Sequence, residues 1–344
     1  MKRISEEDLQ HIHNHTQDIW DEVRNKSIFI TGATGFFGKW LLESFLYVNK
    51  KLSLNARVCA LSRNPEAFLK LNPFYKNEPS VSFIKGDIQD FDFPSETFQF
   101  IIHAATDADA KLNDENPILM LDTITSGTRR ILDFAKTQPL ESFLLTSSGA
   151  VYGKQPADIV HIKEDNTFFI DINNPASAYA EGKRIAELYC SIYHKQYNLP
   201  VKIARCFAFV GPYLPLDKHF AIGNFILNGL NNEDIIVKGD GSPYRSYLYA
   251  ADLTIWLWTI LLKGKENVPY NVGSDFSLNI KDTAAIVAER FNNRIDLKIL
   301  GKQSGLPIQR YAPDCKMAKK DLGLNVNISL SDAIDKTILF NTNS

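Results

Sequence analysis

A glycine-rich turn between a short apolar run and a helical pattern limits the fold of this chain more than any other feature. Residues 27–31 read as a buried strand and residues 39–46 read as a helix. Glycines at every third position between such elements are typical of a dinucleotide site, because they let the backbone turn tightly and approach a pyrophosphate at the helix N-terminus. The turn therefore predicts dinucleotide contacts at Gly32, Thr34, Gly35, Phe36, Phe37 and Gly38.

Strand patterns recur beyond this turn, and segments that can be helical separate most of them. The strand candidates are residues 57–61, 81–85, 100–103, 142–146 and 201–206. This alternation predicts an α/β fold, a Rossmann-type doubly wound parallel sheet with helices on both faces. Substrate is then expected outside the carboxyl ends of the strands.

The same patterns divide the chain into three parts. Residues 1–26 are predicted to be an N-terminal helical extension, with one helix over residues 5–24, and residues 27–206 the dinucleotide-binding domain. Residues 207–344 are expected to form mostly a smaller substrate-binding cap, with helices over 221–230 and 278–291. Segments near 245–252 and 270–274 are expected to return to the dinucleotide-binding domain.

A tyrosine and a lysine four residues apart are the main candidates for chemistry. Asn174 and Pro175 predict a helix start, so Tyr179 and Lys183 rise from one helical face, one turn apart. A phenol needs a drop of roughly three pKa units to act as a base near neutral pH, and nearby cations lower the pKa of a phenol. Lys183 and an oxidised nicotinamide would supply that drop, while the hydroxyl of Ser148 would hold the same substrate oxygen.

The chain resembles a known family from about Lys26 to about Ala333: the extended short-chain dehydrogenases/reductases that act on nucleotide sugars, or NAD-dependent epimerase/dehydratase family. The motifs that carry the resemblance are TGATGFFG at 31–38, GDI at 86–88, HAAT at 103–106, TSSGAVYG at 146–153, YAEGK at 179–183, GDGSPYRSY at 239–247 and NVGS at 271–274.

This resemblance implies a role for several individual residues. It implies that Ser148, Tyr179 and Lys183 are the catalytic set, with Tyr179 and Lys183 also touching the cofactor. Arg245 is implied to hold the diphosphate of a nucleoside-diphosphate sugar, which suits a guanidinium fork. Further cofactor contacts are implied at Asp87, Ile88, Ala104, Ala105 and Thr106.

Two positions after Ser148 depart from part of the family. The 4,6-dehydratases and nucleotide-glucuronate decarboxylases have acidic residues there, whereas this chain has Gly149 and Ala150. Neither residue can protonate a leaving group. An acid could reach the site from elsewhere, and the candidates are Asp107, Asp109, Glu181 and His219. The loop that usually carries an asparagine before its Gly-Pro turn has Ala208 instead.

The end of the second strand bears on the choice of cofactor. Ser62, Arg63 and Asn64 offer no carboxylate for the ribose hydroxyls, and Arg63 could pair with a 2′-phosphate. The cofactor is therefore NAD or NADP, with NADP slightly favoured. Arg63 as an ordinary solvated side chain is nearly as simple an explanation.

Together these features predict an enzyme that oxidises or reduces C4 of a nucleoside-diphosphate sugar, a 4-epimerase or related C4 redox enzyme. One alternative is a 4-keto-sugar reductase, which runs half of that cycle. A second is a 4,6-dehydratase or decarboxylase. An alternative of a different class is a dinucleotide-binding module without turnover, which the complete Ser148, Tyr179 and Lys183 set disfavours.

Composition points to a protein that acts on small molecules inside the cell. The formal net charge is −2 and no dense Lys/Arg block occurs, so no nucleic-acid partner is expected. The N-terminus lacks a signal-like apolar core, and the longest apolar stretch, residues 253–262, is about half a membrane span. We expect a cytoplasmic protein without a membrane partner, and, by resemblance, a homodimer.

Metal and disulfide sites are not expected. The four cysteines show no metal-type spacing and read as buried thiols. His11, His13 and His15 alternate in sequence, so they do not share one helical face and read as solvated side chains.

Overall fold

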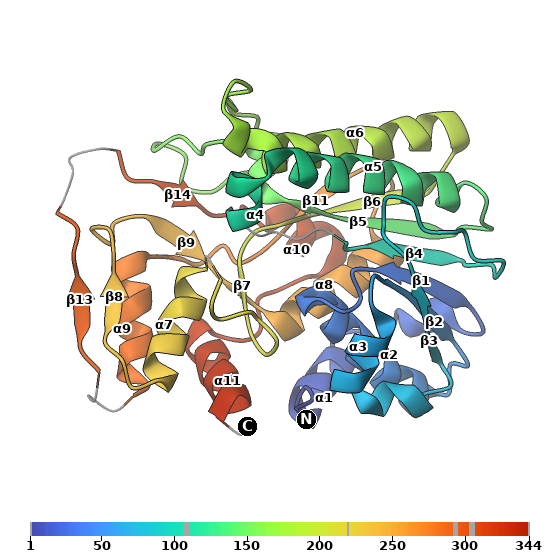
Figure 1. Cartoon of the computed structure of the whole chain (residues 1–344), viewed down its shortest axis with the longest axis horizontal. Coiled ribbons are helices and arrows are strands. Elements are labelled where there is room, and N and C mark those ends of the chain that lie inside the picture. The colour runs from blue at the N-terminus through green and yellow to red at the C-terminus, as the bar shows by residue number, and fades with distance from the viewer. Residues whose placement is uncertain (1, 106–109, 219, 292–294, 303–306, 343–344) are drawn as a thin grey trace.

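A parallel sheet in the order β11-β6-β5-β4-β1-β2-β3 forms the centre of the molecule (Figure 1). The computed structural model describes residues 2–105, 110–218, 220–291, 295–302 and 307–342. The strands of the sheet are β1 (Ser27–Thr31), β2 (Arg57–Ser62), β3 (Val81–Lys85), β4 (Phe100–His103), β5 (Ser142–Ser148), β6 (Val201–Cys206) and β11 (Pro269–Val272). All of their pairings are parallel, which confirms the predicted fold class.

Helices cover both faces of this sheet, as the strand and helix alternation predicts. Helices α5 (Pro117–Ala135) and α6 (Ala178–Tyr197) pack together on one face. The other face carries α2 (Phe36–Leu52) and α8 (Ala250–Lys263). Every residue from Ala250 to Leu261 is buried, so the longest apolar stretch of the sequence is a core helix. Within the described residues, no helix combines the length and apolar character needed to cross a membrane.

The N-terminal segment is a short helix followed by a 3-10 turn, so the single helix expected over residues 5–24 is wrong. Helix α1 (Glu6–Asn14) is separated from the 3-10 turn η1 (Trp20–Val23). Thr16 holds the break, because its hydroxyl donates to the carbonyl of Ile12 (2.6 Å) and accepts from the indole of Trp20 (2.8 Å). Helix α1 packs against α2 and α8, so this segment is part of the main core.

Two of the three alternate histidines, His11 and His13, are not solvated, which contradicts the expectation from the sequence. His13 is buried, and Nε2 of His11 lies 3.1 Å from Oδ1 of Asp252. Asp252 is itself fully buried and also accepts from the backbone N–H groups of Asn327 and Ile328. This carboxylate therefore connects the N-terminal helix to the C-terminal part of the chain.

A smaller unit beside the sheet comes mostly from the C-terminal part of the chain (Figure 1). It contains α7 (Ala221–Leu230) and α9 (Ile280–Glu289), close to the two predicted cap helices, and α11 (Leu330–Thr342). Its strands are β8 (Ile235–Val237) with β13 (Leu297–Ile299), and β12 (Ser277–Asn279), β9 (Tyr244–Ser246) and β14 (Arg310–Tyr311) in one small sheet.

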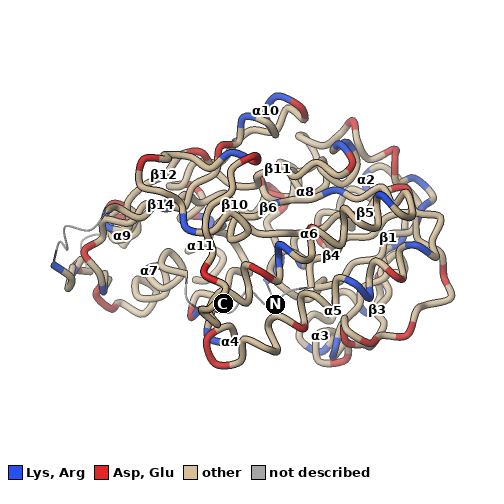
Figure 2. The backbone as a smooth tube through the Cα atoms, turned by 90° about the horizontal axis from the view of Figure 1, so that it is seen from above, with Lys and Arg blue, Asp and Glu red and all other residues tan. Residues whose placement is uncertain are grey.

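The remaining elements are short and lie at the periphery of the sheet and in its connections. Strands β7 (Phe209–Val210) and β10 (Leu248–Tyr249) pair with each other. The short helices are α3 (Pro65–Leu71), α4 (Ala110–Glu115) and α10 (Lys316–Leu322). Basic and acidic residues are interspersed along the backbone of both parts of the molecule (Figure 2). All four cysteines are buried and free, as expected for reduced thiols.

A buried histidine links the two central strands to α5. His103, at the end of β4, has Nδ1 2.8 Å from the Thr31 hydroxyl and Nε2 3.2 Å from the Thr128 hydroxyl. Burial, and secondarily the charge of Lys183, lowers the pKa of His103 to about 3. The ring is therefore neutral in the folded protein throughout the physiological pH range.

We predict that this histidine makes the protein less stable in mild acid. Below pH 6.5 the unfolded chain binds a proton at His103 that the folded chain does not, so the free energy of unfolding falls as the pH falls. Between pH 7 and pH 5 the loss attributable to His103 is about 2 kcal/mol. Urea unfolding at pH 7 and pH 5 should show that the free energy of unfolding of His103→Gln falls by about 2 kcal/mol less than that of the wild type. Equal losses in the two proteins would contradict the assignment.

Candidate active site

The three positions of the turn after β1 that carry glycine differ in whether the structure requires glycine there. Gly32 has φ +73°, and a Cβ there would lie 2.4 Å from the carbonyl oxygen of Ala104. A Cβ on Gly38 would lie 2.3 Å from the backbone of Ala33. Gly35 is exposed, and the nearest atom to its Cβ position is 3.4 Å away, so the protein itself does not require glycine there. Gly35 is where a ligand could approach the backbone.

Helix α2 starts at this turn, so its N-terminal backbone N–H groups lie beside Gly35. Gly35 is the N-cap, and the first N–H groups of a helix have no acceptor inside it. The side chains of Phe36 and Phe37 pack against the core, and the Phe37 ring meets Phe209 edge-on. Their backbone N–H groups, with partly exposed Thr34 beside them, are thus what this turn offers to a pyrophosphate. The turn fits a dinucleotide.

The segment after β4 lies directly against that turn. Ala104 N donates to the carbonyl of Thr31 (3.2 Å), and Ala105 N donates to the Thr31 hydroxyl (3.2 Å). The structure thus places Ala104 and Ala105 beside the turn, where a cofactor contact stays a prediction. Thr106, predicted as the next contact, lies outside the described residues, as do Asp107, Asp109 and His219.

The ends of β2 and β3 lie next to each other on the far side of the turn. Ser62 is nearly buried and its hydroxyl accepts from Asn64 N (3.3 Å), whereas Arg63 is exposed. The carboxylate of Asp87 accepts from Gln89 N (3.0 Å) and shapes the turn after β3. Ile88 is buried against Gly127 of α5, so its side chain is part of the core. The predicted adenine and ribose contacts therefore come from adjacent strand ends.

Ser148, Tyr179 and Lys183 come together at the junction of β5 and α6. Ser148 is the last residue of β5, and Tyr179 lies in the first turn of α6. Lys183 is 3% exposed, its Nζ donates to the carbonyl of Thr146 (2.9 Å), and it lies 5.9 Å from the centre of the Tyr179 ring. The three residues predicted from sequence motifs thus share one site.

Burial dominates the ionisation of this trio. It raises the pKa of Tyr179 to about 12, although the nearby Ser148 hydroxyl acts in the opposite direction. Burial lowers the pKa of Lys183 to about 8, while nearby Cys206 and Glu187 raise it. In the protein alone the phenol is therefore protonated at neutral pH. The lowered phenol pKa expected from the sequence requires further positive charge.

A partly buried ion pair lies next to the Ser148, Tyr179 and Lys183 site. Arg205 and Glu187 form a salt bridge with an N–O distance of 2.7 Å, and the Glu187 carboxylate also accepts from the Ser147 hydroxyl (2.5 Å). Glu181, one of the candidate acids, instead pairs with Arg184 (3.3 Å). The guanidinium of Arg184 also donates to the carbonyl of Val151 (2.7 Å).

The structure adds two aromatic residues that the sequence reasoning missed. A Cβ on Gly149 would lie 2.6 Å from the Tyr311 hydroxyl and 2.8 Å from the Phe207 ring. The Tyr311 ring also packs against Phe207, with 4.7 Å between the ring centres. No signal in the sequence connects Tyr311 with Ser148. The space beside Ser148 is thus filled by residues far away in sequence.

Arg245 lies beside Tyr311 because β9 and β14 pair as parallel strands. The register places Tyr311 opposite Arg245. The Arg245 guanidinium donates to the carbonyl of Tyr244 (2.8 Å). Within the described part of the chain, no carboxylate lies at ion-pair distance from it. Its charge is thus available to an anionic group near Ser148.

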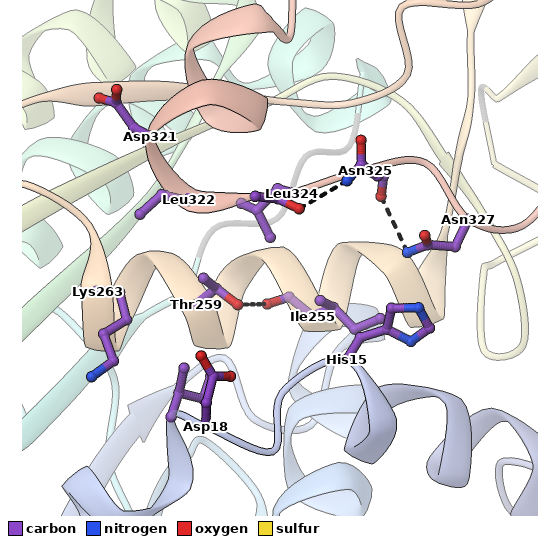
Figure 3. Close-up of a pocket in the computed structure, with 12 residues that line it drawn as sticks. His15, Asp18, Ile255, Thr259, Lys263, Asp321, Leu322, Leu324, Asn325 and Asn327 are labelled. Carbon is purple, nitrogen blue, oxygen red and sulfur yellow. Dashed lines mark hydrogen bonds between the residues drawn. The ribbon is translucent and has the colours of Figure 1, made fainter.

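A separate pocket of about 350 Å³ lies between the N-terminal segment, α8 and the chain after α10 (Figure 3). His15 and Asp18 approach it from one side and Asn325 and Asn327 from the other. None of the predicted catalytic or cofactor-binding residues lines it, so this pocket is distinct from the site at the strand ends.

Strand order, turn glycines and the residues at the end of β5 define a Rossmann-fold enzyme with a nicotinamide dinucleotide cofactor. The chain belongs to the NAD dependent epimerase/dehydratase family, whose model matches residues 28–273. Among curated proteins it is similar to UDP-glucuronic acid decarboxylase 5 of Arabidopsis thaliana, with 28% identity over 312 residues, covering 90% of this chain and 87% of the relative.

Two solved structures share the fold over nearly their entire length. The UDP-N-acetylglucosamine 4-epimerase of Methanobrevibacter ruminantium superposes with a TM-score of 0.80 at 21% identity, covering 93% of this chain and 99% of that one. The UDP-glucose 4-epimerase of Thermotoga maritima gives 0.79 at 18% identity, covering 92% and 99%. These structures establish the fold.

We predict that alanine substitutions separate the ligand-facing glycine from the packing glycine. Gly38→Ala should destabilise the protein by about 1–3 kcal/mol or more, because the new methyl group overlaps the Ala33 backbone. Gly35→Ala should leave the melting temperature nearly unchanged but weaken NAD(H) binding at least tenfold. Thermal unfolding and fluorescence titration with NADH would measure the two effects. Unchanged NADH affinity in Gly35→Ala would contradict a pyrophosphate at this glycine.

Proposed function

We propose that this protein oxidises and reduces C4 of a nucleoside-diphosphate sugar and acts as a 4-epimerase. The similar proteins act on UDP sugars by name, and the trio at the end of β5 suits removal of a hydroxyl proton with hydride transfer. The observation that carries the choice of reaction is the packing around Gly149. Tyr311 and Phe207 fill the space in which an acidic side chain would lie in a dehydratase or decarboxylase.

Each residue of the site has a role in this proposal. Tyr179 takes the proton of the C4 hydroxyl, and Ser148 donates a hydrogen bond to the same sugar oxygen. Lys183 favours the phenolate of Tyr179 and holds the cofactor ribose. Arg245 holds the diphosphate. Reversible hydride transfer at C4 would be supplied by a nicotinamide cofactor held at the turn after β1, and C4 would be inverted when the keto sugar presents its other face.

Because the pKa of Tyr179 is raised, nearby positive charge must lower it before the phenol can act as a base. A nearby positive charge lowers the pKa of an acid by one to three units. Lys183 and an oxidised nicotinamide together would bring the Tyr179 pKa from about 12 into a range of roughly 6 to 10. Since the pKa of Lys183 is itself about 8, this help is lost as the pH rises beyond that value.

The cofactor and the place of the substrate are also part of the proposal. The family description names NAD, whereas the exposed Arg63 and the lack of a carboxylate in Ser62-Arg63-Asn64 favour the 2′-phosphate of NADP. The substrate lies between the sheet and the unit that contains α7 and α9, because Tyr311, which pairs with Arg245 on that side, lies against Gly149 at the end of β5.

A decarboxylase is the second candidate, because similar curated proteins carry that name. Gly149 and Ala150 oppose it, since neither carries a proton. A 4-keto reductase uses the same residues as an epimerase and differs in exchanging its cofactor at each turnover.

A homodimer formed through α5 and α6 is consistent with large apolar side chains exposed on these helices. Leu188 of α6 is 58% exposed, and Ile118 and Leu119 of α5 are also exposed. Sedimentation of the wild type and of Leu188→Glu would test this assembly. We place the enzyme in the cytoplasm, where nucleotide sugars would be at hand.

Product analysis tests the reaction directly. Purified protein is incubated with UDP-glucose, UDP-N-acetylglucosamine and UDP-glucuronate, and the sugars are identified by proton NMR. We expect a C4 epimer from at least one of them without net cofactor consumption, and near-stoichiometric NAD or NADP released on denaturation.

Tyr179→Phe is the control for this experiment. It should reduce turnover by at least about a hundredfold, because the proton acceptor is lost, while cofactor binding is retained. Release of CO₂ from UDP-glucuronate would establish the decarboxylase instead. Turnover only with added NADPH and a keto sugar would establish a reductase, and cofactor binding without any turnover would indicate a binding module.

A further inference from the structure

Helix α6 carries a further charged residue on the face that holds the proposed catalytic residues. Tyr179, Lys183 and Glu187 follow one another at intervals of four residues, so their side chains lie on one face of the helix. The Glu187 side chain is 13% exposed. A carboxylate so far removed from water needs partners, and these partners show what it holds in place.

The Glu187 carboxylate binds two neighbouring strands at once. The Ser147 hydroxyl of β5 donates to Oε1 (2.5 Å). The Arg205 guanidinium of β6 donates to the same oxygen through Nε (3.0 Å) and to Oε2 through a terminal nitrogen (2.7 Å). Ser147 and Arg205 are partners in the parallel register, so these bonds meet at one level of the sheet. Because a two-pronged pair fixes angle as well as distance, Glu187 holds α6 at one place along both strands.

This attachment is adjacent to the residue that places Lys183. Lys183 Nζ donates to the carbonyl of Thr146 (2.9 Å), and Thr146 directly precedes Ser147 in β5. Two successive turns of α6 thus bind two successive residues of β5, and Ser148 follows them. A lysine head group sits on a flexible stem, so its position depends on where its acceptors lie. The Lys183 ammonium remains on this carbonyl as long as α6 keeps its place along β5.

The far side of the ion pair is anchored as well. Another Arg205 nitrogen donates to the Tyr152 hydroxyl (3.0 Å) and to the Glu164 carbonyl (2.8 Å). The Tyr152 hydroxyl donates in turn to the amide oxygen of Asn271, on β11 (2.6 Å). The guanidinium is therefore held from two sides, so its bond with Glu187 is a fixed point for α6.

We propose that Glu187 is a positioning residue: its carboxylate clamps α6 to β5 and β6 and so holds the Lys183 ammonium on the Thr146 carbonyl, one helical turn from Tyr179. In this role Glu187 touches neither substrate nor cofactor and transfers no proton. Its effect on turnover rests on the proposed C4 chemistry, whereas its effect on the place and charge of Lys183 does not.

The groups around Lys183 give this clamp a measurable signature. Tyr179 and Glu187 face it from α6, Cys206 from β6 and His103 from β4. Burial lowers the pKa of Lys183, whereas Cys206 and Glu187 raise it. The hydrogen bond from the ammonium to the β5 carbonyl acts in the same direction as Glu187, because it favours the charged form. Weakening the clamp therefore lowers the pH at which Lys183 loses its proton.

The first readout is the titration of Lys183 itself. Full-length protein is labelled with lysine that carries carbon-13 at the ε position, and carbon NMR follows the titration with NADH bound. Lys183→Met identifies the Lys183 resonance. We expect a midpoint of about 8 in the wild type and one about one pH unit lower in Glu187→Gln.

The kinetic readout uses the same variant. In Glu187→Gln, kcat should fall about five- to tenfold above pH 8, because fewer molecules keep the Lys183 charge that favours the phenolate. Its alkaline limb should move to lower pH by about one unit, with KM within about twofold of the wild type. Glu141→Gln is the matched control, because Glu141 pairs with Lys26 (2.6 Å) just before β5 begins. It should change neither the Lys183 midpoint nor the pH profile.

A shorter carboxylate separates position from charge. Glu187→Asp keeps the negative charge but lacks one methylene, so it cannot reach Ser147 and Arg205 from the same helix position. We expect a Lys183 midpoint below that of the wild type in this variant too. A wild-type midpoint and pH profile in Glu187→Asp would show that charge alone is needed and would contradict the clamp.

The outcomes also separate this inference from the proposed function. An unchanged Lys183 midpoint in Glu187→Gln overturns the inference, even if that variant melts at a lower temperature and the enzyme is an active epimerase. A protein without turnover on any nucleotide sugar overturns the proposed function, while the midpoint still decides the role of Glu187. If Glu187→Gln fails to fold, Ser147→Ala decides, because it removes one partner of the carboxylate and leaves the ion pair. Its Lys183 midpoint must then lie below that of the wild type, and an equal midpoint contradicts the inference.

Discussion

The close approach of two backbone segments at the centre of the sheet is the constraint on which the rest of the site depends. The turn after β1 and the segment after β4 meet so closely that Gly32 has no room for a side chain beside Ala104. Thr31 fixes this contact by binding His103 and Ala105 at once. Because parallel strands end at the same edge, this junction also sets the position of β5 and therefore of Ser148.

The proposed catalytic trio depends on burial as much as on proximity. Lys183 and Tyr179 are both displaced from their usual pKa values by loss of water, in the directions that favour their neutral forms. At neutral pH the Tyr179 phenol is therefore neutral, while Lys183 still carries its proton. Binding of an oxidised cofactor and ionisation of the phenol would then be coupled.

Much of this molecule could be predicted from its sequence, because the relevant signals are local. The turn glycines, the strand at 27–31 and the 3-10 turn Pro175–Ser177, which leads into α6, follow from backbone preferences and short-range periodicity. The placement of Tyr179 and Lys183 on one face needs only the helical repeat. The prediction of one helix over residues 5–24 is wrong because it uses periodicity alone. The helix breaks at Thr16, where the Thr16 hydroxyl accepts a hydrogen bond from the Trp20 indole, and hydrophobic periodicity does not predict such a side-chain contact.

The sequence by itself thus determined the α/β class, the dinucleotide turn and the residues able to transfer a proton. Only the tertiary structure decided what surrounds them. Gly35 differs from Gly32 and Gly38 through what lies opposite each one and, for Gly32, through a φ of +73°, and Gly149 is adjacent to Tyr311 because β14 pairs with β9. Contacts between residues more than a hundred positions apart depend on strand register and packing, which no short sequence pattern encodes.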